Sequence, residues 1–365
     1  MAAIHVESLR SWGLFPESGP ALIAGPCSAE NREQVLASAR FLSGCGVAVM
    51  RAGLWKPRTH PGSFEGVGDK GLEWLLEARG QCGIRICTEV AGAAHVKACL
   101  DAGVDALWIG ARTTSNPFLV QEIADALAGT DTPVLVKNPL NPDLDLWAGA
   151  LERLNDSGVR RLALVHRGFT PVSGTKYRNE PQWRLILEMR RRLPDMPLFC
   201  DPSHIAGDTH YVGELSATAM GLGYDGLMVE AHPCPSEALS DSAQQLGPEA
   251  LAALVAGLRR RDKDSDDESY RNRMAGLRAR IDMLDDELLG ILSQRLDICR
   301  EIGREKRDHN VSIVQTSRWE NVLSRAVASA PGYKLDKGFV SDLFNLIHEA
   351  SVNEQNSILS EYDEN

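Results

Sequence analysis

Four side chains of metal-binding type follow short apolar runs that lie far apart in the sequence. They are Cys27 in GPCS, His204 in DPSH, Glu230 in VEAH and Asp241 in LSDS. One thiolate, one imidazole and two carboxylates form a mixed ligand set that suits Mn²⁺, Fe²⁺, Co²⁺ or Zn²⁺ better than Mg²⁺ or Ca²⁺. We therefore expect one divalent metal ion as a cofactor. His166 and His232 also end apolar runs, so the residues alone leave either of them open as the imidazole ligand.

Cationic side chains form a second group with the same placement. They lie in short motifs: Arg51, Lys56 and Arg58 in RAGLWKPRTHPGSF, Arg112 in GARTTSN, Lys137 in VKNP and Arg167 in HRGF. Cations gathered at one site repel one another unless anions neutralise them, and guanidinium groups match phosphate and carboxylate with paired hydrogen bonds. The sequence therefore predicts a small substrate with several negative charges. The alternative is that each of these residues is an ordinary surface charge.

Eight apolar runs position both groups of side chains. They span residues 21–28, 47–53, 84–90, 105–111, 133–138, 161–168, 197–203 and 226–232. Stretches with helical periodicity follow them, as at residues 72–79 and 181–193. This alternation predicts an α/β protein built on a (β/α)₈ TIM barrel, whose active site lies at the carboxyl ends of the strands. Because strands 1, 7 and 8 are neighbours in a closed barrel, the four metal-type side chains are expected to converge.

The composition favours a cytoplasmic enzyme. The chain has 365 residues, of which 43% are hydrophobic, and a formal net charge of −11, which argues against a nucleic-acid surface. Eight cysteines occur without any CxxC pair, as is typical of a reduced cytosolic protein. We recognise no signal peptide, and no apolar run is long enough to span a membrane. We therefore expect small-molecule substrates, with no nucleic acid and no membrane as partners.

The character of the sequence changes near residue 258, where an almost wholly polar stretch begins. Beyond it, apolar residues recur at intervals of three, four or six, which predicts an amphipathic helix that ends near residue 308. Two further helices are expected at residues 318–330 and 337–359. The expected domains are a barrel at residues 1–257, a polar linker at 258–268 and an all-α domain of three helices at 269–365.

Several motifs together resemble known families. GPCS, KPRT, GARTTSNPF, VKNP, HRG, DPSH and LSDSAQQL, spread over about residues 21–257, resemble the type I 3-deoxy-D-arabino-heptulosonate 7-phosphate (DAHP) synthases of the β subfamily. LRARIDMLDDELLGILSQRLDICREIGREK and HEASVNEQ resemble the all-α chorismate mutases. The chain is thus identified as a bifunctional enzyme of aromatic amino acid biosynthesis, with expected transferase and isomerase activities. The resemblance implies condensation of phosphoenolpyruvate with erythrose 4-phosphate, the first step of the shikimate pathway, and rearrangement of chorismate to prephenate.

The resemblance also implies roles for the barrel residues. Phosphoenolpyruvate would be bound by Arg51, Lys56, Arg112, Lys137 and Arg167, with Lys56 and Lys137 as catalytic residues. Erythrose 4-phosphate would be bound by Pro57, Arg58 and Thr59. The metal ion, on Cys27, His204, Glu230 and Asp241, would polarise the aldehyde oxygen of the tetrose. Glu89, in CTEV, is expected either to orient a water molecule or to pair with a nearby lysine.

Helix geometry constrains the second active site. Lys306 lies eleven residues after Arg295, so at about 100° per residue both side chains lie on nearly the same face. Arg278 lies seventeen residues before Arg295, about 25 Å away along a continuous helix, so it reaches the same small ligand only from a partner chain. The resemblance implies such an intertwined homodimer. The implied chorismate-binding residues are Arg278 from one chain and Arg295, Lys306, Arg318, Ser351 and Gln355, of which Lys306 and Gln355 are catalytic.

The sequence leaves alternative functions open. On the second predicted helix Trp319 stands where many such mutases carry a glutamate that grips the substrate hydroxyl. An alternative function is therefore an active DAHP synthase whose helical domain only dimerises and binds chorismate or prephenate as a regulatory module. A third interpretation is the related 3-deoxy-D-manno-octulosonate 8-phosphate synthase, which the KPRT motif and the helical domain oppose. We also expect allosteric control, in which a ligand of the helical domain changes the synthase activity.

Overall fold

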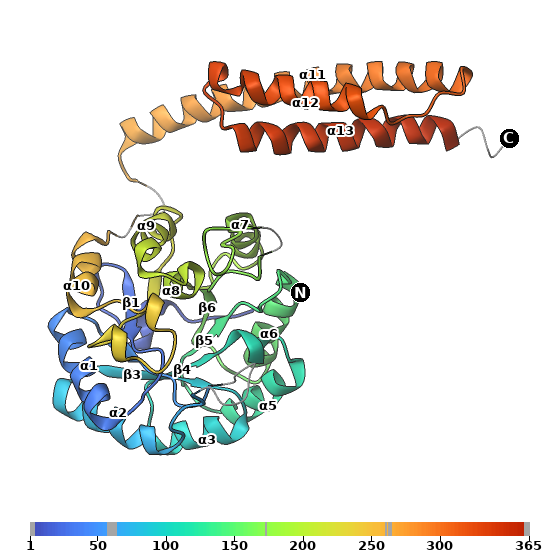
Figure 1. Cartoon of the computed structure of the whole chain (residues 1–365). Helices are drawn as coiled ribbons and strands as arrows, with labels where there is room; N and C mark the ends of the chain where they lie inside the picture. Colours follow the sequence, from blue (N-terminus) through green and yellow to red (C-terminus); the bar gives the residue numbers. More distant parts are fainter. Residues whose placement is uncertain (1–3, 57–63, 172–173, 260, 262–264, 361–365) are drawn as a thin grey trace. The chain divides into compact units, whose positions relative to one another are not determined.

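The computed structural model describes residues 4–56, 64–171, 174–259, 261 and 265–360. The chain divides into two compact units, Met1–Lys263 and Asp264–Asn365, and each is described by itself. Strands fill the centre of the first unit and helices surround them (Figure 1). The second unit is helical.

Eight parallel strands form a closed barrel in sequence order. They are β1 (Ala21–Gly25), β2 (Val49–Arg51), β3 (Arg85–Val90), β4 (Ala106–Ile109), β5 (Val134–Lys137), β6 (Leu162–His166), β7 (Leu198–Cys200) and β8 (Gly226–Glu230). The barrel closes where β1 pairs with β8, from Ala21 opposite Gly226 to Gly25 opposite Glu230. The predicted (β/α)₈ fold is confirmed.

Helices cover the outside of the strands. The helices of this unit are α1 (Arg32–Gly44), α2 (Lys70–Cys82), α3 (Ala93–Ala102), α4 (Ala111–Thr114), α5 (Pro117–Leu127), α6 (Leu144–Asp156), α7 (Trp183–Arg192), α8 (Pro202–Ala206), α9 (Val212–Gly221) and α10 (Pro248–Gly257). Of these, the short α4 and α8 lie instead at the carboxyl ends of β4 and β7. Side-chain caps fix several of their starts, because an acceptor at the cap satisfies a free backbone N–H of the first turn. Asn31 accepts from the Gln34 amide before α1, and Asp143 accepts from the Leu146 amide before α6.

The barrel interior is a separate apolar cluster that the residues before β1 complete. Ile23, Trp108 and Phe199 point inward from three strands and are fully buried. Trp12, at the end of the short 3₁₀ helix η1 (Leu9–Trp12), joins this cluster and is 5% exposed. The amino-terminal segment therefore closes the end of the barrel that lies opposite the carboxyl ends of the strands.

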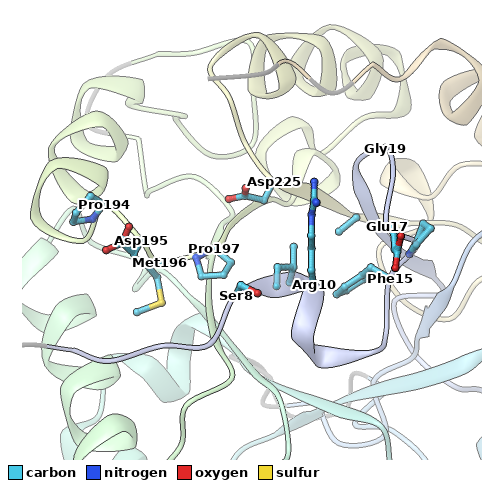
Figure 2. Close-up of a pocket in the computed structure, with 13 residues that line it drawn as sticks. Ser8, Arg10, Phe15, Glu17, Gly19, Pro194, Asp195, Met196, Pro197 and Asp225 are labelled. Carbon is cyan, nitrogen blue, oxygen red and sulfur yellow. The ribbon is translucent and has the colours of Figure 1, made fainter. Parts of the chain in front are cut away.

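A pocket borders this amino-terminal closure. Figure 2 shows it between the segment that carries Arg10 and Phe15 and the loops before β7 and β8, which contribute Pro197 and Asp225. Because its residues precede the strands, this pocket lies at the end of the barrel away from the predicted active site.

The helical unit contains three long helices, as predicted. They are α11 (Glu268–Asp308), α12 (Thr316–Ser329) and α13 (Lys337–Ser360), with the 3₁₀ helix η5 (Ala330–Tyr333) between the last two. Helix α13 packs against α11 and α12. The second half of α11 is partly covered, so that Cys299 and Gly303 are buried. In its first half, by contrast, Ile281 and Leu284 are 57% and 62% exposed.

Among the described residues, none of the helices combines the length and the apolar character that crossing a membrane requires.

The close approach of β1 and β8 generates a prediction about Gly226. A methyl group there would lie 2.2 Å from the Ala21 carbonyl oxygen and 2.6 Å from the Phe199 ring, so Gly226→Ala must push apart the strands that close the barrel. We expect a loss of about 1–3 kcal/mol in the free energy of unfolding of the barrel, as for other overpacked cores. Urea unfolding measures this change.

Gly149→Ala, in α6, is the matched control, because a methyl group at Gly149 meets no described atom within 4 Å. Alanine is also the better helix former by up to about 1 kcal/mol, so this variant should be as stable as the parent or slightly more stable. Equal stability of the Gly226→Ala and Gly149→Ala proteins would contradict the prediction.

Candidate active sites

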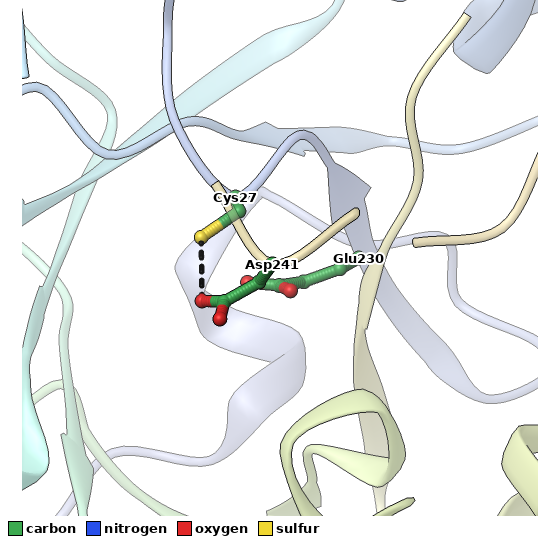
Figure 3. A group of neighbouring side chains, drawn as sticks. All are labelled: Cys27, Glu230 and Asp241. Carbon is green, nitrogen blue, oxygen red and sulfur yellow. Dashed lines mark hydrogen bonds between the residues drawn. The ribbon is translucent and has the colours of Figure 1, made fainter. Parts of the chain in front are cut away.

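Three of the four predicted metal ligands meet at the carboxyl end of the barrel. Cys27 follows β1, Glu230 ends β8, and Asp241 lies in the loop after β8 (Figure 3). One ligand atom from each lies within 4.8 Å of the others. The Cys27 thiol donates a hydrogen bond of 3.3 Å to Asp241 Oδ2. The pairing of β1 with β8 therefore brings together residues from the two ends of the barrel sequence.

His204 lies beside this group, on the short helix α8 after β7. Its Nε2 is 3.8 Å from Glu230 Oε1, and its Nδ1 is 2.9 Å from Asp201 Oδ2. A carboxylate on Nδ1 favours the tautomer in which Nδ1 carries the proton and Nε2 has a free lone pair. His204 thus lies next to the three other predicted ligands, outside the 4.8 Å group that those residues form.

The two other candidate histidines face different surroundings. His166 Nδ1 is 2.9 Å from the Tyr224 hydroxyl oxygen, and its ring stands edge-on to Trp183. His232 Nδ1 accepts a hydrogen bond of 3.1 Å from the Cys234 amide. Neither belongs to the group of metal-type ligand atoms found among the described residues. His204 is outside this group as well, but its Nε2 lies 3.8 Å from Glu230 Oε1, which makes it the candidate imidazole nearest to the group.

The donor set is suited to a divalent cation. Burial raises the pKa of the Cys27 thiol to about 12, and the negative charge of Glu230 adds to this effect. Burial also raises the pKa of Asp241, but the charges of His204 and Arg178 outweigh it and leave this pKa below its usual range. A buried thiol beside two carboxylates ionises readily only when a metal ion compensates the negative charge. Sulfur, imidazole and carboxylate ligands fit Mn²⁺, Fe²⁺, Co²⁺ or Zn²⁺.

A pocket rich in cations opens next to these ligands. Its lining residues are Cys27, Lys56, Glu89, Gly110, Ala111, Arg112, Lys137, Leu140, Arg167, His204 and Asp241. Four of the predicted phosphoenolpyruvate-binding residues are among them. The fifth, Arg51, does not line the pocket but is fully buried, with its guanidinium 3.0 Å from Glu230 Oε1 and 4.8 Å from the centre of the Trp108 ring. Three of the metal-type residues and four of the predicted anion-binding residues therefore line one cavity.

Burial shapes the charges of this pocket. It lowers the pKa of Lys137, although an ion pair of 2.7 Å with Asp201 opposes the shift. It also lowers the pKa of Arg167 to about 10. Lys56 Nζ is 3.8 Å from Glu89 Oε2, so the structure shows the lysine partnership that was one of the two expectations for Glu89.

The predicted residues for the tetrose phosphate are Pro57, Arg58 and Thr59. They lie outside the described residues.

Four predicted mutase residues meet between α11 and α13. Arg295 Nη1 donates to Ser351 Oγ, and Lys306 Nζ donates to Gln355 Oε1 over 3.2 Å. Ser351 and Gln355 are 4% and 8% exposed, and Gln355 Nε2 also donates to the Ser351 carbonyl oxygen. The structure therefore brings the two cations and their polar partners to one face, as helix periodicity predicts.

Arg278 and Arg318 do not join this group within the chain. Both are exposed, Arg278 in the first half of α11 and Arg318 in the first turn of α12. Arg278 is about 25 Å from Arg295 along the continuous helix α11. Trp319, the residue at the position of the expected glutamate, stacks on the His348 ring with 3.9 Å between the ring centres.

Sequence reasoning missed Asp201, although a signal for it existed. Asp201 follows β7 directly, in the same position relative to its strand as the predicted residues. It is fully buried, and its Oδ2 accepts from Lys137 and lies 3.7 Å from Arg51 Nη1. The pKa of its carboxyl is held well below the usual range because, against the effect of burial, the charges of His204 and Lys137 favour the carboxylate. Asp201 thus contacts both a metal-type residue, His204, and two of the predicted anion-binding cations, Arg51 and Lys137.

Both units of the chain match known families. Residues 17–264 match the DAHP synthetase I family, and residues 277–356 match chorismate mutase type II. The phospho-2-dehydro-3-deoxyheptonate aldolase of Thermotoga maritima is 36% identical over 240 residues, which are 66% of this chain and 69% of that protein. A 2-dehydro-3-deoxyphosphooctonate aldolase of Syntrophotalea carbinolica is 31% identical over 251 residues, which are 62% of this chain and 84% of that protein.

Solved structures of DAHP synthases are also similar to the barrel unit of this chain. The crystal structure of the Thermotoga maritima aldolase, a DAHP synthase, superposes with a TM-score of 0.59 and 35% identity, over 65% of this chain and 67% of that one. A truncated form of the same organism's synthase gives a TM-score of 0.57 and 33% identity, over 65% of this chain and 84% of the truncated one.

The chain belongs to the DAHP synthetase I family, whose match covers more than half of its length. It also contains a chorismate mutase type II domain. The predicted fusion of two enzymes is confirmed, and the helical match opposes an octulosonate 8-phosphate synthase. The interpretation of the helical domain as a purely regulatory module is not favoured.

The surroundings of His166 generate a prediction about acid stability. Burial lowers the pKa of His166 to about 3, whereas in the unfolded chain it is near 6.5. The unfolded chain therefore takes up the proton first, and this contribution to stability, complete above pH 6.5, is lost as the pH falls from about 6.5 to 3. His166→Gln, which keeps an acceptor for Tyr224, should reduce the loss of unfolding free energy by up to about 1.4 kcal/mol per pH unit in this window.

Urea unfolding at pH 7 and pH 4.5 measures this difference. His210→Gln is the control, because His210 is exposed. Metal binding should be unchanged in His166→Gln, since this side chain contacts Tyr224 and Trp183. A parallel pH dependence in the parent and His166→Gln would refute the proposed role of this histidine.

Proposed function

We propose that the barrel pocket condenses phosphoenolpyruvate with D-erythrose 4-phosphate to give DAHP and phosphate, and that the helical domain rearranges chorismate to prephenate. One observation carries the first part. Four cations, Lys56, Arg112, Lys137 and Arg167, line a single cavity together with residues suited to hold a divalent metal. Both proposed substrates of the barrel are anionic, so such a cavity overcomes their mutual repulsion and holds them in reacting geometry.

The cations divide between two tasks in this proposal. The four lining cations, with the buried Arg51 beneath them, bind the carboxylate and phosphate of phosphoenolpyruvate. Arg51 suits this task because its Nε is buried without a hydrogen-bond acceptor among the described residues. Pro57, Arg58 and Thr59 bind the phosphate of the tetrose. Lys56 and Lys137 are the catalytic lysines, since both line the cavity beside the metal-type residues.

The metal-type residues flank the same cavity. Cys27, His204, Glu230 and Asp241 would hold one divalent ion, which supplies Lewis acidity at the aldehyde oxygen of the tetrose. Asp201 Oδ2 lies 2.9 Å from His204 Nδ1, and His204 Nε2 lies on the Glu230 side of the ring, 3.8 Å from Glu230 Oε1. Glu89 holds Lys56 at the edge of the cavity.

In the helical domain the proposed catalysis depends on charged and polar side chains held in fixed positions around the substrate. The rearrangement of chorismate needs no nucleophile, so binding the reactive conformer and stabilising the charge on its ether oxygen are sufficient. Lys306 and Gln355 lie within hydrogen-bond distance of each other and serve the ether oxygen. Arg295, held by Ser351, binds a carboxylate of the substrate, and Arg318 adds positive charge.

A homodimer through the helical domain completes each mutase site in this proposal. Two features of α11 support it. Ile281, Leu284 and Leu288 are at least half exposed on its first half, as expected for a helix face that a second chain covers. Arg278 lies on this half, about 25 Å from Arg295, so only the partner's copy reaches the site.

We place the enzyme in the cytoplasm, and all eight cysteines, which are free, suit a reducing compartment. The fusion also supports regulation, in which prephenate bound to the helical domain inhibits the synthase with a coupling of about 1–3 kcal/mol.

Removal of metal should separate the two activities. Treatment with a strong chelator should lower DAHP formation by about 100-fold or more, because Lewis acidity contributes several kcal/mol to such reactions. Chorismate consumption should stay within twofold, since the mutase site uses only side chains. Cys27→Ala should behave like the chelated enzyme and bind metal more weakly. Equal loss of both activities on chelation, or undiminished metal content in Cys27→Ala, would overturn the assignment.

Mixed dimers test the shared mutase site. Arg278→Ala and Arg295→Ala homodimers should both lack mutase activity, because both active sites of each homodimer lack one of the two arginines. Refolding an equal mixture should restore about one quarter of the parent's activity, since half of the dimers are mixed and each of these has one intact site.

The synthase activity of both variants is the internal control and should equal that of the parent. The absence of recovered mutase activity, after subunit exchange has been demonstrated, would show that each chain builds its own site.

A further inference from the structure

Two residues link the carboxylates of the candidate metal group and lie outside every role assigned above. Gln244 Nε2 donates a hydrogen bond of 2.7 Å to Glu230 Oε2. Arg178 Nη1 donates to Gln244 Oε1 over 2.8 Å and to Asp241 Oδ1 over 2.9 Å. These three hydrogen bonds form one continuous bridge, here called the carboxylate bridge, from Glu230 to Asp241.

The carboxylate bridge binds only one oxygen atom of each carboxylate. It occupies Oε2 of Glu230 and Oδ1 of Asp241. The other oxygen of each carboxylate faces the remaining metal-type ligands, since Asp241 Oδ2 is 3.3 Å from Cys27 Sγ and Glu230 Oε1 is 3.8 Å from His204 Nε2. Each carboxylate thus directs one oxygen toward the metal-type ligands while the bridge fixes the other. Glu230 Oε1 also accepts a hydrogen bond of 3.0 Å from Arg51, and its second lone pair can still serve a metal ion.

Charge and burial strengthen this arrangement. Gln244 is 1% exposed and Glu230 is fully buried, so their hydrogen bond is shielded from water. Two carboxylates this close repel each other, and the guanidinium of Arg178 opposes that repulsion. Asp241 also has a left-handed backbone, with φ of 48°, which is uncommon for a residue other than glycine. A side-chain anchor therefore stabilises a loop conformation that the backbone alone disfavours.

The segment that carries Arg178 is docked on the helix that carries His204. The Arg178 and Asn179 amides donate to the carbonyl oxygens of Ala206 and Ile205, at the end of α8. Gly207, with φ of 72°, makes room for this contact, because a methyl group there would lie 2.4 Å from Arg178 Cβ. The loop before α7, helix α8 and the loop after β8 are thereby held together around the metal-type ligands.

We propose that Arg178 and Gln244 are positioning residues that hold Asp241 and Glu230 at the spacing a divalent metal ion requires. The inference rests on the proposed metal site and adds to it the residues that organise its ligands. Groups that orient metal ligands from behind typically affect metal affinity by about 10- to 100-fold.

Metal affinity without substrates is the direct test, with Mn²⁺ as the probe and calorimetry as the measurement. Gln244→Ala and Arg178→Ala should each weaken Mn²⁺ binding about 10- to 100-fold. Lys176→Ala is the matched control, because it removes a cation two residues from Arg178 whose partner is the exposed Glu214. This control should bind Mn²⁺ as the parent does.

Two further measurements separate positioning from folding. The metal-free Arg178→Ala protein should still unfold cooperatively, at a temperature no more than about 2–4 °C below the parent's, because the Arg178 side chain is 48% exposed and only a loop loses its anchor. The absorption bands of the Co²⁺-loaded protein should change in both variants, since they report the ligand geometry. Gln244→Glu keeps an acceptor for Arg178 but cannot donate to Glu230 when ionised, so it should also bind Mn²⁺ weakly.

The double variant tests whether the two residues act as one bridge. Arg178→Ala combined with Gln244→Ala should weaken Mn²⁺ binding little more than the stronger single variant, because members of one network are not additive. Binding within twofold of the parent in both single variants, with an unchanged Co²⁺ spectrum, would overturn the bridge alone. Failure of the parent to bind Mn²⁺ or Co²⁺ would instead overturn the proposed metal site.

Discussion

The buried ion pairs of Arg51, Lys137 and Asp201 are the constraint on which the active-site end of the barrel depends. Arg51 and Asp201 are fully buried, and Lys137 is 4% exposed. An unpaired charge at this depth costs several kcal/mol, so each side chain must keep its partner. Arg51 spans from Asp201 to Glu230, and Asp201 spans from Lys137 to His204. The ion pairs that stabilise the carboxyl end of the barrel core thus also contact the pocket-lining Lys137 and the metal-type residues Glu230 and His204.

Because the same ion pairs stabilise the barrel core and position the candidate active site, a change at one residue affects both stability and the site. Removing Asp201 would leave Lys137 without its partner of 2.7 Å and would release the Nδ1 side of the His204 ring. Removing Glu230 would leave Arg51 without its closest carboxylate. A change in either carboxylate therefore disturbs the charge balance of the core as well as the site.

The sequence predicted those features that follow from the strand and helix repeats. A closed barrel gathers residues from strand ends, so Cys27, Glu230 and Lys137 could be placed at one site without knowledge of the loops. Helical periodicity likewise placed Arg295 and Lys306 on one face. Contacts made by irregular segments were not predictable in this way. Arg178 and Gln244 meet only because two loops take particular conformations, one with Asp241 in the left-handed region.

Burial within the repeats was also difficult to predict. Arg51 and Lys56 come from one motif, yet Arg51 lies in the core and Lys56 lines the pocket. Trp12 fills the barrel from a segment without any regular pattern, which sequence reasoning did not recognise. The domain limits and the individual residue roles stay predictions.

The pairing of β1 with β8 has a consequence for how the protein matures during synthesis. Cys27 precedes Glu230 and Asp241 by most of the barrel sequence, and the β1–β8 pairing completes the group. Such long-range strand pairing forms late, after the local strand and helix units. A growing chain on the ribosome therefore carries Cys27 as an isolated thiol until residues beyond Asp241 have emerged. Translation order thus delays assembly of the metal-type ligands until the barrel can close.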